Sequence, residues 1–326
     1  MGGDQAPGEI VAGTILAHRE GLGTMILVGD RALIAPLLSG LGPDEIEIVH
    51  VEGQVSMDEH PSRAVRIADQ TSLGVAVNLV RDGRADAVVS AGNSGAFLAI
   101  ALVRLRTIPG ISRPAIATVF PGLKGPIVML DAGANVDCRP EWLMQFGMMG
   151  SAYARSVLKI ETPRVGIVSN GEERTKGNQQ VIEAATLLDA APVNFVGNVE
   201  GKDILYGMAD VIVTDGFVGN VILKFAEGAV SFFAQVIRDM VDTGSIFVKI
   251  GALMMRPQLR RTFRRLSYEA FGGAPLLGVN GNCIVAHGRA DREAIKNACR
   301  VASLEAQEDV LGKIRDLVLP LVSKEA

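Results

Sequence analysis

The stretch ADVIVTDGFVGNVILK, residues 209–224, decides the fold class of this chain. Its first half is a short apolar run at residues 210–213, rich in β-branched side chains, which is typical of a strand buried on both faces. A turn that contains Asp, Gly and Asn follows, and a long apolar helical pattern begins at about Val218. A buried strand that leads through a glycine turn into a helix is the repeating unit of α/β proteins.

The same unit recurs along the chain. Further strands are predicted at residues 25–28, 46–51, 85–89, 115–120, 127–130, 164–168 and 193–196. Helices are predicted at residues 61–81, 96–105, 141–158, 178–188 and 218–241. Strands that alternate with helices predict an α/β fold with three layers, αβα, around a mostly parallel sheet. Residues 2–7 look like a loop between a strand and a helix that starts near Gly8, so either the sheet lacks this first strand or the chain begins later than its relatives do.

Composition narrows the class of protein. The chain has 326 residues, of which 48% are apolar and 21% charged, so it can bury a full core as one unit, residues 1–326. A net charge of −4 gives no electrostatic case for nucleic acid. Three cysteines without metal-ligand spacing, and no basic and apolar leader, favour a cytoplasmic protein without disulfides. The longest run without a charge or a turn signal, residues 96–103, is far short of the ~20 residues that span a membrane.

Glycine combines with Asn, Asp or Ser directly after four predicted strands. The four loops are residues 91–95, 131–135, 170–178 and 215–220. In a parallel sheet they would share the carboxyl edge, where α/β proteins bind ligands. Any one of these four loops could be an ordinary turn without a binding role, because Gly and Asn are common turn residues. Four together, with Lys176 and Lys224 as point charges and helix N-termini behind them, favour a site for an anionic ligand.

Several common kinds of site are missing from the sequence. The Lys176 loop has neither P-loop nor dinucleotide-binding spacing, and no Gly-x-Ser-x-Gly elbow is present. The four histidines are dispersed, and Cys138 is interpreted as a packed thiol rather than a nucleophile. No convincing metal cluster and no cofactor motif is found, so we expect neither a metal nor a cofactor.

Residues 243–268 combine apolar and basic side chains, and none of them is acidic. The helix from Val218 is predicted to end near Gly251 and a new one to begin near Pro257, so that an arm at about residues 228–268 forms a helical hairpin. Such a composition suits a membrane surface or an acidic partner, and an oligomer contact or a solvated face is an equal alternative. The candidate contact residues are Leu253, Met254, Met255, Arg256, Arg260, Arg261, Arg264 and Arg265, and Lys249 adds a further charge.

Taken together, the motifs resemble the bacterial phosphate acyltransferase family, the acyl-carrier-protein:phosphate acyltransferases that make fatty acyl-phosphate. The resemblance rests on motifs that run in family order from residue 1 to about residue 290. They lie at residues 1–7, 90–96, 110–116, 131–135, 176–178, 195–201, 215–224 and 272–281. Two departures are visible: a short strand usually precedes Met-Gly-Gly-Asp, and Ser94 stands where Thr is common.

The resemblance implies a fold like that of isocitrate and isopropylmalate dehydrogenases. It also implies a homodimer in the cytoplasm that associates peripherally with the membrane. The implied reaction moves a long-chain acyl group from acyl carrier protein to inorganic phosphate. The acyl-phosphate would then pass to a glycerol-3-phosphate acyltransferase for phospholipid synthesis. A short-chain phosphate acyltransferase that uses coenzyme A and a non-catalytic peripheral membrane scaffold are the two alternatives.

The family's chemistry suggests a role for each candidate residue. Lys176 would bind phosphate, and Asn220 would donate to the oxyanion or orient phosphate. Backbone groups that approach the anion are expected at Gly95, Gly133 and Gly216. Side-chain donors are expected at Asn93, Ser94, Asn135 and Asn178. Three carboxylates, Asp4, Asp131 and Asp215, would either orient Lys176 and nearby amides or cap the structure.

Overall fold

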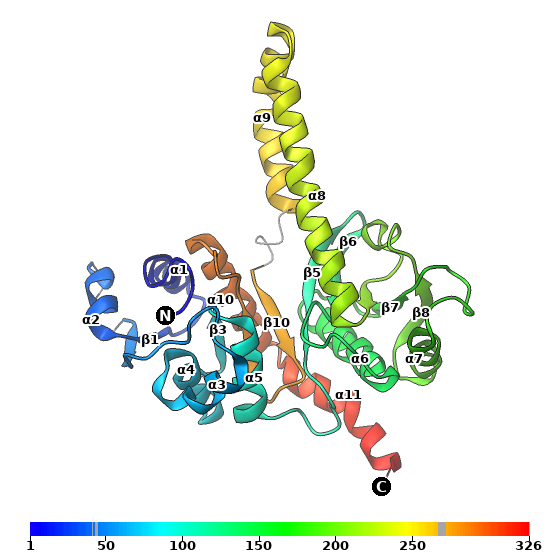
Figure 1. The fold of residues 1–326 in the computed structure, drawn as a ribbon, viewed down its shortest axis with the longest axis horizontal. Coiled ribbons are helices and arrows are strands. Elements are labelled where there is room, and N and C mark those ends of the chain that lie inside the picture. The colour runs from blue at the N-terminus through cyan, green and yellow to red at the C-terminus, as the bar shows by residue number, and fades with distance from the viewer. Residues whose placement is uncertain (41, 43–44, 267–271, 326) are drawn as a thin grey trace.

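The computed structural model describes residues 1–40, 42, 45–266 and 272–325, and its strands form three hydrogen-bonded sheets (Figure 1). In the first, β1 (Ile26–Gly29) pairs in parallel with β2 (Glu47–His50). The second has the order β3 (Ala87–Ser90), β11 (Asn282–Val285), β10 (Ala274–Leu277) and β4 (Ala115–Ile116). The third has the order β5 (Thr118–Gly122), β6 (Gly125–Leu130), β9 (Val211–Val213), β7 (Arg164–Val168) and β8 (Asn194–Val199).

The predicted parallel pairing is confirmed, but the prediction of a single sheet is wrong. Five pairs are parallel, whereas β5 runs antiparallel to β6 and β10 runs antiparallel to both of its neighbours. The strand predicted at residues 115–120 is divided into β4 and β5. Between them, the Ala117 N–H donates to the carbonyl of Pro275 at 2.8 Å, so the chain passes from the second sheet to the third at this residue.

Eleven α-helices are present in the described part of the chain. They are α1 (Gly8–Arg19), α2 (Arg31–Ile34), α3 (Pro61–Arg66), α4 (Ser72–Arg81), α5 (Ser94–Leu105), α6 (Pro140–Ser156), α7 (Gln179–Ala190), α8 (Gly216–Thr243), α9 (Ile246–Leu266), α10 (Arg292–Gln307) and α11 (Val310–Glu325). The helix predicted at residues 61–81 is interrupted. Thr71 has extended backbone, and its hydroxyl accepts from the Gly74 N–H, so it ends one helix and caps the next.

Helix α6 lies at the centre of the largest core cluster. Phe146, Met148, Met149 and Tyr153 are buried on it, and the helix packs on the third sheet and on α7 and α11. A Cβ at Gly150 would lie 2.5 Å from a methyl carbon of Val211 on β9. Only glycine therefore lets this helix approach the sheet so closely at the start of β9.

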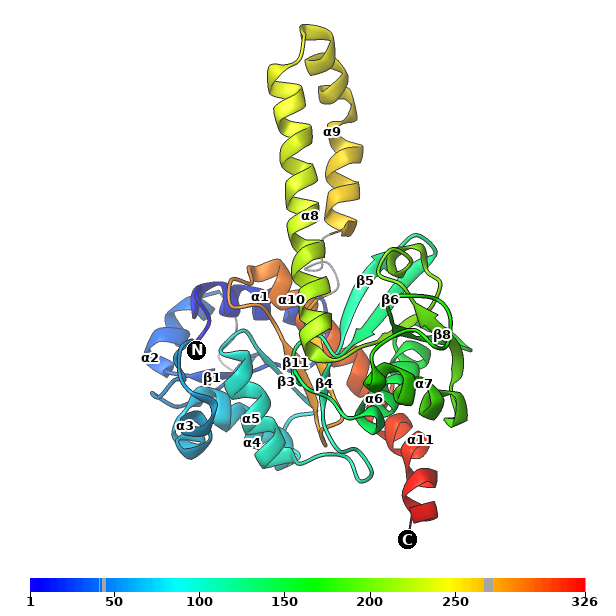
Figure 2. The same ribbon diagram turned by 45° about the vertical axis from the view of Figure 1, so that its right-hand side comes forward.

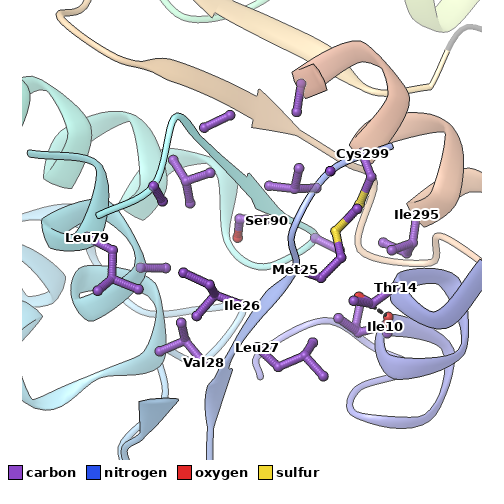
Figure 3. Close-up of a pocket in the computed structure, with 18 of the residues that line it drawn as sticks. Ile10, Thr14, Met25, Ile26, Leu27, Val28, Leu79, Ser90, Ile295 and Cys299 are labelled. Atoms are coloured by element: carbon purple, nitrogen blue, oxygen red, sulfur yellow. Dashed lines mark hydrogen bonds between the residues drawn. The ribbon is translucent and has the colours of Figure 1, made fainter. Parts of the chain in front are cut away.

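A cavity of about 440 Å³ separates β1 from β3. Figure 3 shows its apolar lining, which includes Leu27 of β1, Leu79 of α4, and Ile295 and Cys299 of α10. Each of the two strands is paired on its other side, β1 with β2 and β3 with β11. The predicted loop at residues 2–7 leads into α1, and no strand precedes it in the described residues.

Helices α8 and α9 run side by side and project away from the sheets (Figures 1 and 2). The predicted helix ends near Gly251 and Pro257 are wrong. The turn lies at Gly244, and Pro257 is inside α9. The apolar residues 250–255 therefore lie along α9 rather than between two helices. Pro257 is exposed, so water can satisfy the carbonyl that proline leaves without a donor.

The sequence predicted that no apolar run is long enough to span a membrane, because the longest one covers only residues 96–103. Helix α8 corrects this expectation. It is 28 residues long with a mean hydropathy of 1.4 in its most apolar window, of which 6% is buried. By length and composition alone, it is the one helix in the described ranges that could cross a membrane. The sequence pattern concealed it because Lys224 and Glu227 interrupt the apolar run.

Candidate active site

The loops after β6 and β9 interlock at the carboxyl edge of the third sheet. Leu130 pairs with Val213 at the ends of these strands. The Thr214 N–H donates to the Leu130 carbonyl at 2.7 Å, and the Asp131 N–H donates to the Thr214 carbonyl at 2.9 Å. The Gly216 N–H then reaches the carbonyl of Asn135 at 2.7 Å. Residues 131–135 and 215–220, which the sequence treats as two loops, are thus one structural unit.

Asp131 is fully buried and organises this unit. Its carboxylate accepts hydrogen bonds from the backbone N–H groups of Ile116, Gly133, Ala134 and Asn135 at 2.6–3.2 Å. Burial raises the pKa of Asp131, and the donors around it oppose that rise. The Asp131 oxygens face the loop's own backbone and the Asn135 side-chain amide, which agrees with capping and with the predicted orientation of nearby amides.

The start of α8 packs tightly on the same loop. A Cβ at Gly219 would lie 1.9 Å from the Asp131 carbonyl oxygen, so only glycine fits there. Asp215 caps the helix, its carboxylate accepting from the Val218 N–H at 2.8 Å. The Asn220 side chain lies beside Gly133, about 3.7 Å from where a Cβ would be. Asn220 is exposed, and its amide makes no hydrogen bond within the described residues, so it is free to meet a ligand.

Lys176 lies on the next loop along the same edge. That loop follows β7, which pairs with β9 so that Ile167 lies opposite Val213. Lys176 is exposed and makes no ion pair with any residue that the structure describes. Asn178 caps α7 through its side-chain oxygen, which accepts from the Val181 N–H at 2.9 Å. Lys224, by contrast, is paired with Glu227 at 2.9 Å, which reduces its value as a free charge.

Two of the predicted amide donors are already used by the protein. The Asn93 amide nitrogen donates to the carbonyls of Ser56, Met57 and Glu59 at 2.9–3.3 Å. The Asn135 amide nitrogen donates to the Pro114 carbonyl at 2.8 Å and to Asp131 at 2.9 Å. Neither amide has a hydrogen left for an anion, so the prediction that they donate to one is wrong.

The remaining predicted residues gather at the carboxyl edge of the second sheet. Ser94 and Gly95 are exposed in the first turn of α5, directly after β3. The Asp4 N–H donates to the carbonyl of Gly288 beyond β11 at 2.9 Å, and its carboxylate lies 3.9 Å from Arg289. The sequence placed all four loops on one edge. The structure instead divides them between two sheets, with Lys176 and Asn220 on the third.

Cys138 lies next to this site and behaves as a packed thiol. It is half-buried, and its Sγ donates to the carbonyl of Asn135 at 3.4 Å. Burial, together with the nearby charge of Asp131, raises the pKa of Cys138 to about 12, so the reactive thiolate is disfavoured at neutral pH. This supports the interpretation that Cys138 is not a nucleophile.

Two features near the Lys176 loop were not singled out as site residues from the sequence. Asn198 on β8 donates to three carbonyls of this loop. The Gly-Asn pair at residues 197–198 is its only signal, and it served only as part of a family motif. The carboxylates of Glu172, Glu200 and Asp203 also lie within 4.8 Å of one another. Lys202 pairs with both glutamates, so the protein already compensates part of the charge of this group.

These features define an α/β protein with a candidate anion site at the carboxyl edge of its largest sheet. The model of a family described as "Fatty acid synthesis protein" matches residues 1–313. A phosphate acyltransferase of Heliobacterium modesticaldum is 48% identical over 319 residues, which cover 97% of this chain and 95% of the relative. One of Pelotomaculum thermopropionicum is also 48% identical and covers 100% of this chain and 95% of its own length. The chain belongs to the phosphate acyltransferase family and is an acyltransferase.

Solved structures support the fold alone. A phosphotransacetylase from Streptococcus pyogenes superposes with a TM-score of 0.64 at 17% identity, covering 93% of this chain and 92% of that one. A phosphotransacetylase from Staphylococcus aureus gives a TM-score of 0.60 at 16% identity and covers 92% of each chain. The family model and the two relatives confirm the resemblance to the acyltransferase family. The resemblance of the fold to isocitrate and isopropylmalate dehydrogenases stays a prediction.

Proposed function

We propose that the enzyme transfers a long-chain fatty acyl group from the thioester of acyl carrier protein to inorganic phosphate. The observation that supports this most directly is the pair formed by Lys176 and Asn220. Both side chains are exposed, neither makes a hydrogen bond or ion pair with another described residue, and the two loops follow adjacent strands of one sheet. A fixed cation and an uncommitted amide are suited to an attacking phosphate and to the oxyanion that the attack creates.

In this mechanism a phosphate oxygen attacks the thioester carbonyl carbon and forms a tetrahedral oxyanion. The C–S bond then breaks, the carbonyl is restored as acyl-phosphate, and the thiolate leaves on the carrier. Phosphate esters lose their second proton near pH 6, so the nucleophile is already anionic in the cell. A thiol with an ordinary pKa of about 8.5 needs little acid help to leave. Lys176 would hold phosphate and Asn220 would donate to the oxyanion, so no enzyme nucleophile is required.

One observation favours the short-chain reaction with coenzyme A as a second candidate. The solved structures that share the fold are titled phosphotransacetylases. The description of the matching family as fatty acid synthesis supports the long-chain thioester instead. In that case the product would serve a glycerol-3-phosphate acyltransferase in phospholipid synthesis. A non-catalytic scaffold does not agree with membership of an enzyme family.

The reaction is tested by acyl-phosphate formation from palmitoyl-acyl carrier protein and inorganic phosphate, with palmitoyl- and acetyl-coenzyme A run alongside. We expect product from the carrier-protein thioester and an increase of about 10-fold or more in the KM for phosphate in Lys176→Ala, because the fixed cation is lost. Lys313→Ala, an exposed lysine of α11, is the matched control. Product from acetyl-coenzyme A alone would favour the second candidate. An unchanged KM in Lys176→Ala would remove this residue from the site.

We further propose that the arm at residues 228–268 serves association, within a single unit of residues 1–326. The first half of α8, which leads into the arm, exposes Phe217, Val221, Phe225 and Phe232, with Phe225 77% exposed, and would pack on a second copy to form a homodimer. Near the turn, Phe247 is 81% exposed, and Leu253, Met254, Met255 and Arg256 are exposed along α9. These would meet the membrane or the carrier protein of a cytoplasmic, peripherally bound enzyme. The side chains of Arg260, Arg261, Arg264 and Arg265 lie outside the described residues.

Replacing both Phe247 and Met254 with serine is expected to lower binding to vesicles that contain anionic lipid, because both side chains lose their apolar contact. Acyl-phosphate formation from the carrier-protein thioester should not change if these residues meet lipid, and it should fall if they meet the carrier protein. Co-sedimentation measures the binding, and Phe225→Ser is the control, which should instead lower the mass measured by ultracentrifugation. Vesicle binding that ignores both the double change and added salt would exclude a lipid contact at this end of the arm.

A further inference from the structure

A β-bulge changes the direction of β8 beside the Lys176 loop. Val165 pairs with Phe195, but the next residue of β7, Gly166, pairs with Gly197, so Val196 has no partner across the pair. Gly197 has φ = +99°, which a residue with a side chain rarely adopts. Bulges turn the side chains that follow them, and they occur often next to active sites. The residue directly after this bulge is Asn198.

Asn198 occupies the middle of the Lys176 loop. Its amide nitrogen lies 3.2 Å from the Gly171 carbonyl oxygen, 2.8 Å from that of Glu173 and 3.4 Å from that of Lys176 itself. Its two hydrogens are thus shared among three carbonyls that would otherwise repel one another. Carbonyl oxygens only accept, so a side chain with donor hydrogens is needed to hold the three together.

Two backbone N–H groups of the Lys176 loop also make hydrogen bonds within the loop. The Lys176 N–H donates to the Glu173 carbonyl at 2.9 Å, and the Gly177 N–H donates to the side-chain oxygen of Asn170 at 2.9 Å. Backbone groups before, at and after Lys176 are therefore all held. The Lys176 side chain, by contrast, is exposed and makes no ion pair with the residues described.

We propose that Asn198 is a positioning residue for Lys176. By holding the carbonyls of residues 171, 173 and 176, it fixes the point and direction from which the lysine side chain reaches phosphate. The inference rests on the proposed role of Lys176. A displacement of about 1 Å at a group that positions a reactant can cost about 100-fold in rate, so the effect of a looser loop is measurable.

The test is Asn198→Asp, which keeps the shape of the side chain and replaces its N–H donors with acceptors. We expect the KM for inorganic phosphate to rise by about 10-fold to 100-fold while the KM for the thioester changes little. The melting temperature should fall, because an acceptor now faces the three carbonyls, but the enzyme should stay folded at the assay temperature. Asn194→Asp is the matched control, because it makes the same change at an exposed position of the same strand. If Asn198→Asp does not fold, Asn198→Ser is measured in its place, since a hydroxyl still donates one hydrogen bond.

A double-mutant cycle with Lys176→Ala separates the possible outcomes. If Asn198 acts through Lys176, Asn198→Asp adds little to the KM of the Lys176→Ala enzyme. If the two effects multiply in full, or if Asn198→Asp alone leaves the KM for phosphate unchanged, the positioning role is overturned. If Lys176→Ala itself leaves that KM unchanged, the proposed function of the site fails first. An equal rise in both KM values with a lower melting temperature would show that Asn198 only stabilises the fold.

Discussion

Replacing Asn220 with alanine is expected to lower kcat by about 10²–10³-fold, the usual cost of losing one oxyanion donor. The structure gives the reason. Asn220 projects beside Gly133 from the first turns of α8, and its amide is used by no other described residue. Its hydrogens can therefore stabilise charge that develops in the transition state, so the loss should fall on kcat more than on KM. The measurement is the steady-state rate of acyl-phosphate formation.

The control for this substitution is Gln235→Ala, which removes an exposed amide from the same helix several turns away from the site. Circular dichroism and a thermal melt show whether Asn220→Ala keeps the fold. Gly219 and Asp131 hold this part of α8 in place without any contribution from the Asn220 amide, so we expect the fold to be kept. A folded Asn220→Ala enzyme with near-normal turnover would exclude the oxyanion role.

The second large effect is on stability and comes from Glu305. This residue of α10 is 2% exposed, and one of its carboxylate oxygens, Oε1, has no hydrogen-bond partner among the residues that the structure describes. Burial raises the pKa of Glu305 to about 8 from its ordinary value of 4.5. Burial also raises the pKa values of Tyr153 and Cys283, and above the pKa of Glu305 its ionised form raises them further. The carboxyl group is thus neutral in the folded protein at neutral pH.

The sign of the pH dependence follows from the two pKa values. Between about pH 4.5 and about pH 8 the unfolded chain loses this proton while the folded chain keeps it, so stability falls as pH rises. At 1.36 kcal/mol per pKa unit the full effect is roughly 4–5 kcal/mol. Glu305→Gln removes the ionisation, and it should raise the free energy of unfolding at pH 8 by several kcal/mol and change it little at pH 5.

Urea unfolding at several pH values between 5 and 8 measures this difference. The contributions of other titrating groups cancel when the free energy of unfolding of the variant is subtracted from that of the parent protein at each pH. Glu161→Gln, at an exposed position, is the control and should leave the pH profile unchanged. A Glu305→Gln protein whose stability parallels that of the parent across this range would contradict a proton held by Glu305.

Asparagine shows where inference from the sequence succeeded and where it failed. Asn93, Asn135, Asn178 and Asn220 all lie in glycine-containing loops that follow predicted strands, and all were expected to donate to an anion. The structure shows that Asn93 and Asn135 hold backbone carbonyls instead, whereas the Asn220 amide has no partner in the described part of the chain. These residues look alike in sequence because an amide donates equally well to a carbonyl or to phosphate. Which of the two it meets depends on segments distant along the chain.

The missed strands have a similar explanation. Strands β10 and β11 lie in a segment rich in glycine and asparagine, which resembles a loop. Their pairing partners, β4 and β3, are about 160–200 residues away in the chain. Antiparallel and parallel neighbours that come together from such distances leave little local periodicity. The end of α8 was misplaced for a local reason, because Gly244 was not recognised as the turn and Pro257 was taken as a helix start.

Local physical chemistry made much of this protein readable from the sequence alone. Runs of β-branched residues, glycine turns and capping residues act within a few positions, so they determined the α/β class, most strands and the loops that carry Lys176 and Asn220. The family followed from the same loops, because their residue types keep a fixed order. Only the tertiary structure decided that these loops belong to two sheets, that Asn198 holds the Lys176 loop and that Glu305 is buried without charge. Each of these features depends on contacts between segments that are distant in the sequence. A pattern within a few neighbouring residues cannot predict such contacts or the burial that they cause.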